Sequence, residues 1–67
     1  MADPLAATSK KIREVLDRQG RVSLSQLEVT VEASYNLIFL ALDRMASRRE
    51  IRMERAGGDY RITPPGE

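Results

Sequence analysis

The chain has 67 residues, with 11 Lys and Arg against 10 Asp and Glu, and contains no Cys, His or Trp. These absences exclude a disulfide, a thiolate nucleophile, a His general base and a catalytic triad, and they remove the usual ligands of a structural zinc site. A domain of about 60 residues buries only about 60% of the surface that its unfolded chain exposes, so this chain needs good packing, a partner chain, or both.

The composition is that of a globular domain, because 42% of the residues are hydrophobic and 31% are charged. No apolar run approaches the roughly 20 residues that a membrane helix needs. Residues 1–4 lack the basic region and apolar core of a signal peptide. The sequence therefore predicts a cytoplasmic protein with a single domain over residues 1–67. Its core is expected at about residues 8–63, with partly flexible segments at 1–7 and 64–67.

The charges are unevenly distributed along the chain. Arg accounts for nine of the 11 basic residues, and its planar guanidinium suits phosphate recognition. Between residues 44 and 61, six Arg stand against three acidic residues, which leaves a local surplus of three positive charges. The formal net charge of +1 therefore hides a basic C-terminal part.

The first predicted element is a helix that ends near Gly20, a natural C-terminal stop. Asp3 or Thr8 is suited to cap its N-terminus, and Pro4 suits the first helical position after Asp3. Apolar residues at helical spacing form one stripe, made of Leu5, Ile12, Val15 and Leu16. We expect this stripe to pack in the core.

Residues 21–24 predict a short extended link, and Ser23 then caps a brief second helix. The alternative is a strand, because the β-branched residues at 29–31 lower helix propensity. Gln26 lies three positions after the cap, which is a capping-box pattern and favours the helix. The expected core residues of this helix are Leu24, Leu27 and Val31.

The third predicted helix begins after the N-cap Ser34 and runs to about Arg48 or Arg49 without an interrupting Gly or Pro. Its expected core residues fall within a narrow arc of the helical wheel and are Ile38, Ala41, Leu42 and Met45.

A hairpin is predicted at the end of the chain, with strands at 51–55 and 60–63 around a Gly57-Gly58 turn. Pairing Ala56 with Asp59 sets Met53 opposite Ile62, and Glu54 opposite Arg61. One face then carries Ile51, Met53, Tyr60 and Ile62. The other face carries Arg52, Glu54, Arg61 and Thr63.

This order of elements over about residues 8–63 resembles a winged helix-turn-helix domain. The matching segments are residues 21–27, the third helix after Ser34, and residues 50–52 and 58–64 of the hairpin. The stretch 40–46 is also similar to small stand-alone prokaryotic winged-helix proteins of unassigned role. The resemblance implies an α+β, mostly α fold, in which three helices precede a C-terminal β-hairpin wing.

The resemblance also implies a transcription regulator that binds duplex DNA as a dimer, with the third helix in the major groove and the wing on the backbone. Asn36 would suit adenine and Arg44 guanine. The groove-facing candidates, carried over by position, are Tyr35, Asn36, Phe39, Leu40, Asp43 and Arg44. The candidate phosphate contacts are Arg48, Arg52, Arg55 and Arg61.

Two features depart from the winged-helix pattern. Glu32 lies in the turn where that family often has Gly, so the backbone there must avoid positive φ. Asp43 places a negative charge on the side of the third helix opposite the core, together with Asn36, Leu40 and Ser47. A carboxylate at this position accepts from cytosine N4 but opposes nearby phosphates.

The third helix is apolar nearly all round, because Leu37, Phe39 and Leu40 add to its core face. Helices of this kind are usually buried on both sides. The alternative function is therefore homodimerisation or docking of a protein partner through these three residues.

An enzyme is not expected, because the sequence has no phosphate loop and no convergent carboxylate pair, and it is too short for a sizeable pocket. We likewise expect no cofactor, no metal site, no membrane partner and no small-molecule substrate.

Overall fold

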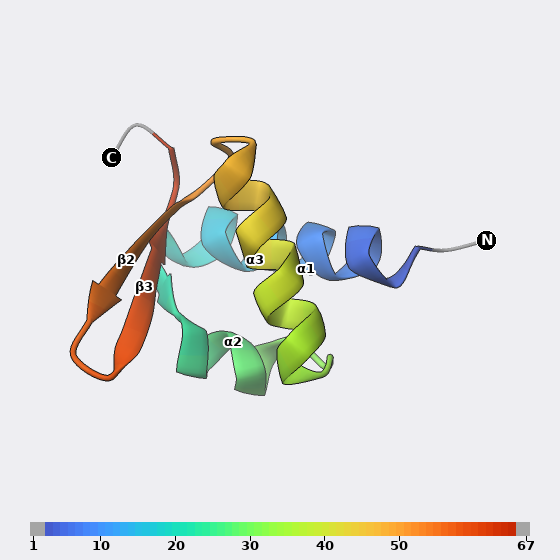
Figure 1. Ribbon diagram of the computed structural model, residues 1–67, viewed down its shortest axis with the longest axis horizontal. Coiled ribbons are helices and arrows are strands. Elements are labelled where there is room, and N and C mark those ends of the chain that lie inside the picture. Colours follow the sequence, from blue (N-terminus) through green and yellow to red (C-terminus); the bar gives the residue numbers. More distant parts are fainter. Residues whose placement is uncertain (1–2, 66–67) are drawn as a thin grey trace.

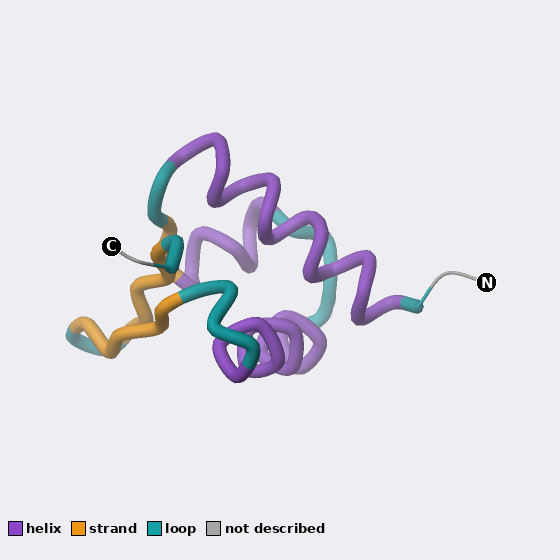
Figure 2. The backbone as a smooth tube through the Cα atoms, turned by 90° about the horizontal axis from the view of Figure 1, so that it is seen from above, coloured by secondary structure: helices purple, strands orange, loops and turns teal. Residues whose placement is uncertain are grey.

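The computed structural model describes residues 3–65, which form three helices and a three-stranded antiparallel sheet (Figure 1). In chain order the elements are α1 (Pro4–Gln19), β1 (Val22–Ser23), α2 (Leu24–Thr30), α3 (Tyr35–Ser47), β2 (Arg52–Ala56) and β3 (Asp59–Thr63). The α+β, mostly α layout is confirmed. Figure 2 shows α3 nearly end-on, with α1 running across it and the strands gathered to one side.

Each helix begins at a side-chain cap. The Asp3 carboxylate accepts from the Leu5 N–H at 3.0 Å, the Ser23 hydroxyl from Gln26 N–H at 3.1 Å, and the Ser34 hydroxyl from Leu37 N–H at 3.3 Å. Of the two caps expected for α1, the structure uses Asp3. Residues 4–7, expected outside the core and partly flexible, form the first turn of this helix. The neighbouring ends, 1–2 and 66–67, lie outside the described residues.

The core lies between the helices and the inner face of the sheet. The stripe predicted on α1 is buried except for Leu5, which is only partly buried and packs against the core. The helix predicted at α2 is confirmed over the strand alternative. The buried hydrophobic residues are Ile12, Val15, Leu16, Val22, Leu24, Leu27, Val31, Ile38, Ala41, Leu42, Met45, Ile51 and Ile62.

The sheet has the order β1-β3-β2, so β3 is the central strand. The predicted hairpin register is confirmed: Met53 lies opposite Ile62, and Glu54 opposite Arg61. The strand bounds differ slightly, because β2 runs over Arg52–Ala56 and β3 begins at Asp59. The extended link predicted at 21–24 contributes the two-residue strand β1, where Val22 pairs with Ile62.

Two turns differ in how well their residues suit the backbone. Glu32 avoids positive φ, as its side chain requires, since Arg49 at φ 59° is the one non-Gly residue between 3 and 65 with positive φ. Arg49 follows the last turn of α3. Its N–H donates to the Ala46 carbonyl at 3.0 Å, and the Glu50 N–H donates to the Met45 carbonyl at 2.8 Å. This is the Schellman arrangement, which usually places Gly at the left-handed position.

No helix within residues 3–65 combines the length and the apolar character needed to cross a membrane.

Candidate nucleic-acid interface

The side of α3 that faces away from the core is exposed along its whole length. Leu40 is 58% exposed and Tyr35 is 51% exposed, although both are large hydrophobic side chains. The exposed residues of this ridge, as expected from the helical wheel, are Asn36, Leu40, Asp43 and Ser47. A helix with this outer side uncovered can contact a groove or another protein.

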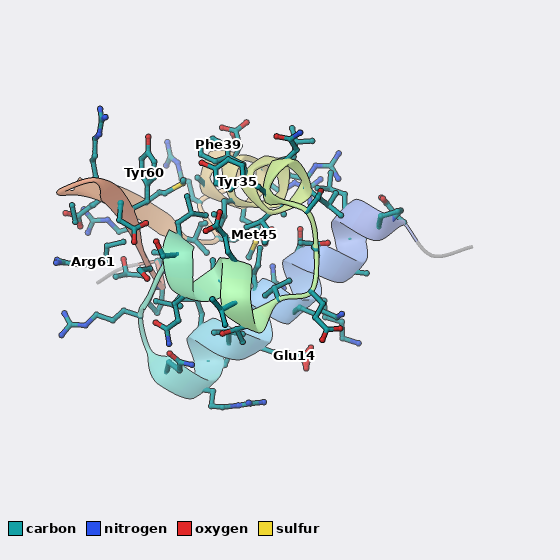
Figure 3. The ribbon with its side chains drawn as sticks, turned by 90° about the horizontal axis from the view of Figure 1, so that it is seen from below. Glu14, Tyr35, Phe39, Met45, Tyr60 and Arg61 are labelled. Carbon is teal, nitrogen blue, oxygen red and sulfur yellow. The ribbon has the colours of Figure 1, made fainter. Side chains whose placement is uncertain are left out.

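Three aromatic rings form a row where α3 meets the hairpin, two from α3 and one from β3. They lie on the same side of the molecule (Figure 3). The centroids of Tyr35 and Phe39 are 5.9 Å apart, and Phe39 meets Tyr60 of β3 at 6.0 Å in a T-shaped arrangement. Edge-to-face geometry of this kind is favourable because of the ring quadrupole. The row therefore packs the hairpin against α3, and Tyr60 packs against the core from the predicted inner face.

This contact changes the place of Phe39 in the candidate site. Phe39 is half-buried and packs against the core cluster as well as Tyr60. Leu37 is also half-buried. The apolar outer face is consequently smaller than the wheel indicates, because the hairpin covers one edge. What remains is an open hollow of about 570 Å³ lined by Tyr35, Asn36, Phe39 and Leu40.

The other flank of α3, next to α1, is basic. Arg44 and Arg48 are both exposed there. They line a hollow of about 330 Å³ together with Lys10 and Arg13 of α1. Lys10 and Arg13 were not among the sequence candidates, because no local signal in α1 indicates which face of α3 it meets.

The Arg residues of the hairpin do not gather on one side. Arg55 lies opposite Tyr60 in the ladder and therefore shares the face that meets α3. Arg52 and Arg61 alternate to the opposite face, and Arg61 lines a hollow with Arg21 and Glu54. Figure 3 shows Arg61 pointing away from the three aromatic rings. Of the three hairpin Arg expected on phosphates, only Arg55 lies on the α3 side.

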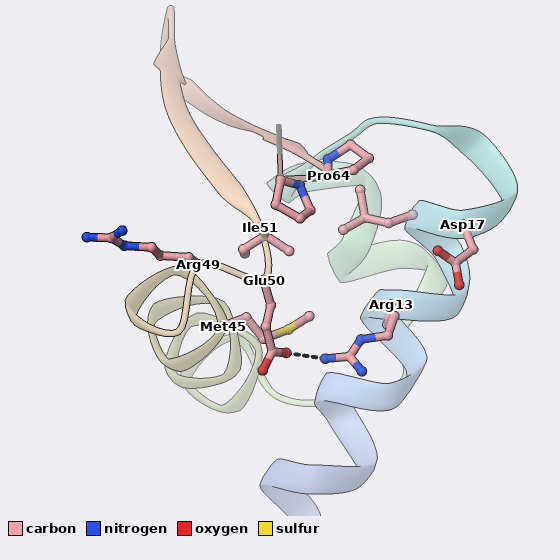
Figure 4. Close-up of a pocket in the computed structure, with 9 residues that line it drawn as sticks. Arg13, Asp17, Met45, Arg49, Glu50, Ile51 and Pro64 are labelled. Atoms are coloured by element: carbon pink, nitrogen blue, oxygen red, sulfur yellow. Dashed lines mark hydrogen bonds and ion pairs between the residues drawn. The ribbon is translucent and has the colours of Figure 1, made fainter. Parts of the chain in front are cut away.

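Two polar contacts fix elements that flank the site. Arg13 of α1 forms an ion pair with Glu50, which follows α3 (Figure 4). This pair borders a further hollow of about 490 Å³ over the apolar side chains of Leu16, Met45 and Ile51. The Arg49 side chain points away from Arg13 in the same view.

The second contact joins α2 to the hairpin. The Ser25 hydroxyl donates to Asp59 Oδ2 at 2.7 Å, and the Tyr60 N–H donates to Asp59 Oδ1 at 2.7 Å. Both bonds favour the ionised carboxylate, and the Ser25 bond is the larger cause of a lowered pKa at Asp59. The ionised form of Asp59, at the start of β3, is thereby favoured down to lower pH.

Within residues 3–65, no group of three or more Asp or Glu side chains is placed to hold a metal ion. Comparison of the chain with protein-family models, with curated proteins and with solved structures finds no match. Inference about function therefore rests on the geometry of α3 and its two flanks.

Proposed function

We propose that this chain is a winged-helix domain that binds duplex DNA, with α3 in the major groove and the β2–β3 hairpin as the wing on the backbone. The supporting observation is that cations border the exposed ridge of α3 on both flanks. Arg44 and Arg48 lie on the α1 flank, and Arg55 lies on the hairpin flank. A helix entering the major groove passes between two phosphate strands, so this placement of charge fits the duplex.

The ridge itself offers groups that read bases. Asn36 is exposed near the start of α3 and has the donor and acceptor that pair with adenine. Asp43 accepts from cytosine, and the apolar surface of Leu40 suits a thymine methyl group.

A salt titration tests this function. The protein is titrated with a labelled random duplex at low salt and again at rising salt. We expect weak binding whose affinity falls log-linearly with salt, because bound phosphates release counterions. Absence of binding at low salt would contradict the proposal.

A matched pair of double variants locates the interface. The double variant Arg44→Gln/Arg48→Gln is expected to reduce the salt slope, which is the slope of log affinity against log salt concentration. The reduction is about 0.9 for each phosphate that the variant no longer neutralises. Arg21→Gln with Arg61→Gln removes the same charge from the opposite side of the sheet and is expected to leave the slope unchanged. Equal slopes for the two double variants would remove α3 from the interface.

The second candidate function is self-association or protein docking through the ridge. It is favoured by the exposure of Leu40 and Tyr35 beside the open hollow, since exposed apolar side chains around a pocket are typical interface anchors. The homodimer version predicts a dimer by light scattering, which Leu40→Glu dissociates. Val29→Glu is the control, because Val29 is 85% exposed on α2. A strict monomer at every concentration would contradict the homodimer.

A further inference from the structure

The hollow between α1 and α3 has an unbalanced charge. Four cations line it, namely Lys10, Arg13, Arg44 and Arg48, and the one carboxylate at its edge is that of Glu50. Glu50 forms an ion pair with Arg13. The hollow is therefore left with a surplus of three positive charges, carried by Lys10, Arg44 and Arg48.

The helix geometry explains this convergence. Lys10 and Arg13 are three residues apart on α1. Arg48 is the C-cap residue of α3 and lies four residues after Arg44, so each pair lies on one side of its helix. Packing of α1 against α3 around Ile12 and Ile38 brings the two sides together. Like charges at these spacings oppose one another, which favours an anion between them.

The backbone after α3 holds Glu50, the one carboxylate at the hollow, in position to pair with Arg13. The Glu50 N–H is bonded to the Met45 carbonyl at 2.8 Å, so the backbone fixes the position from which the Glu50 side chain reaches Arg13. Glu50 consequently neutralises Arg13 at the rim and leaves the three other cations without a carboxylate in the hollow.

Other hollows that contain cations in the described part of the chain are closer to balance. Lys11 and Arg18 line a hollow with Glu14 and Glu32 on another side of α1. Arg13 and Arg49 line a hollow with Asp17 and Glu50 beside the C-terminal end of α3. Each of these two hollows has as many carboxylates as cations. Beside the sheet, Arg21 and Arg61 exceed Glu54 by one charge, so none of the three reaches a surplus of three.

We infer that the hollow between α1 and α3 binds a phosphate group. Arg44 and Arg48 would each present a planar guanidinium to its oxygens, and Lys10 would supply a point charge from the facing helix. The source of this phosphate rests on the proposed function. In a complex with DNA, it is a backbone phosphate of the duplex that α3 contacts. Lys10 then adds α1 to a DNA interface that otherwise consists of α3 and the β2–β3 hairpin.

Neighbouring lysines on α1 provide the test. Lys10→Gln removes the charge that faces α3, and Lys11→Gln removes the same charge from a different side of the same helix, about 100° further round. Both side chains are exposed, so both variants are expected to fold, as checked by circular dichroism. With a random duplex, Lys10→Gln is expected to reduce the salt slope by up to about 0.9, the contribution of one phosphate, whereas Lys11→Gln leaves it at the wild-type value.

A second arm uses inorganic pyrophosphate and follows the backbone amides by nuclear magnetic resonance. We expect saturable shifts at residues 10, 44 and 48 in the wild type and in Lys11→Gln, and their loss in Lys10→Gln. If the wild type fails to bind duplex but shows these shifts, the proposed function fails and the phosphate comes from a small ligand.

Two results overturn the inference. Duplex binding with identical salt slopes in Lys10→Gln and Lys11→Gln would exclude the hollow while leaving the DNA-binding function intact. Absence of both duplex binding and pyrophosphate shifts would exclude the hollow and the function together.

Discussion

The two flanks of α3 meet different neighbours. Toward the hairpin, Phe39 packs edge-to-face on Tyr60. Toward α1, Arg44 and Arg48 stand exposed beside Lys10. One flank fixes the hairpin on the helix through apolar contact, and the other presents charge to solvent.

The contrast shows that one flank of α3 contributes to stability and the other is available for binding. Burial of aromatic surface stabilises the fold and is almost insensitive to dilute salt. Exposed charges contribute little to folding, and their attraction for a ligand is screened within about 10 Å at 0.1 M salt. Substitutions on the two flanks should therefore separate stability from binding.

The largest expected effect comes from the hairpin flank. Phe39→Ala removes the ring that joins α3 to Tyr60 and is expected to lower the free energy of unfolding by about 2 kcal/mol, less than for a fully buried Phe. Urea denaturation measures the decrease. Arg44→Ala on the other flank should change stability by less than about 0.5 kcal/mol. Equal destabilisation by the two variants would show that the flanks do not differ in this way.

The end of the basic flank offers a smaller effect of opposite sign. Arg49 adopts φ 59° at the position that usually holds Gly, so Arg49→Gly is expected to raise the free energy of unfolding by about 1 kcal/mol. Thermal or urea denaturation measures the increase. Destabilisation would show that the Arg49 side chain makes a contact worth more than the backbone strain.

Asp43 lies on the ridge between the two flanks. Asp43→Asn removes a negative charge that opposes phosphates and is expected to raise affinity for a random duplex about fivefold, since charges about 4 Å apart in water interact by about 1 kcal/mol. Fluorescence anisotropy at low salt measures the change, with Ser47→Asn as the neutral control on the same ridge. An unchanged affinity would place the ridge away from the phosphates.

The smallest effect concerns acid stability at the hairpin. The pKa of Asp59 is lowered in the folded state, chiefly by the Ser25 hydroxyl. The stabilisation is therefore present above the ordinary Asp pKa of 3.8 and is lost as pH falls through the lower folded value. Ser25→Ala should reduce the acid dependence of stability below about pH 4. An unaltered pH profile would show that Asp59 does not tie the hairpin to α2.

Local signals in the sequence predict much of this fold. Ser23 and Ser34 cap their helices as expected, because the N-cap signal lies within four residues. The Gln26 side chain, expected in a capping box, instead donates to Gln19 Oε1. The hairpin register follows from the turn and from the alternation of Met53 and Ile62 with charged neighbours.

Contacts between distant segments account for what the sequence does not predict. The extended conformation of Val22 and Ser23 is predicted, but its pairing into the sheet depends on Ile62, far along the chain. Phe39 is partly covered by Tyr60 of another element. Lys10 approaches Arg44 and Arg48 through the packing of two helices. None of these contacts can be recognised from the hydrophobic pattern of a single segment. The separation of Arg61 from Arg55 is an exception, because it follows from the hairpin register and the alternation of side chains along the strands.

The central position of β3 has a consequence for synthesis of the chain. Ile62 is fully buried and lies opposite both Val22 and Met53. The ribosome delivers all three helices before this strand, so the apolar surface that Ile62 covers stays open until β3 has emerged. The native sheet can then close only after β3 is available to pair with both β1 and β2.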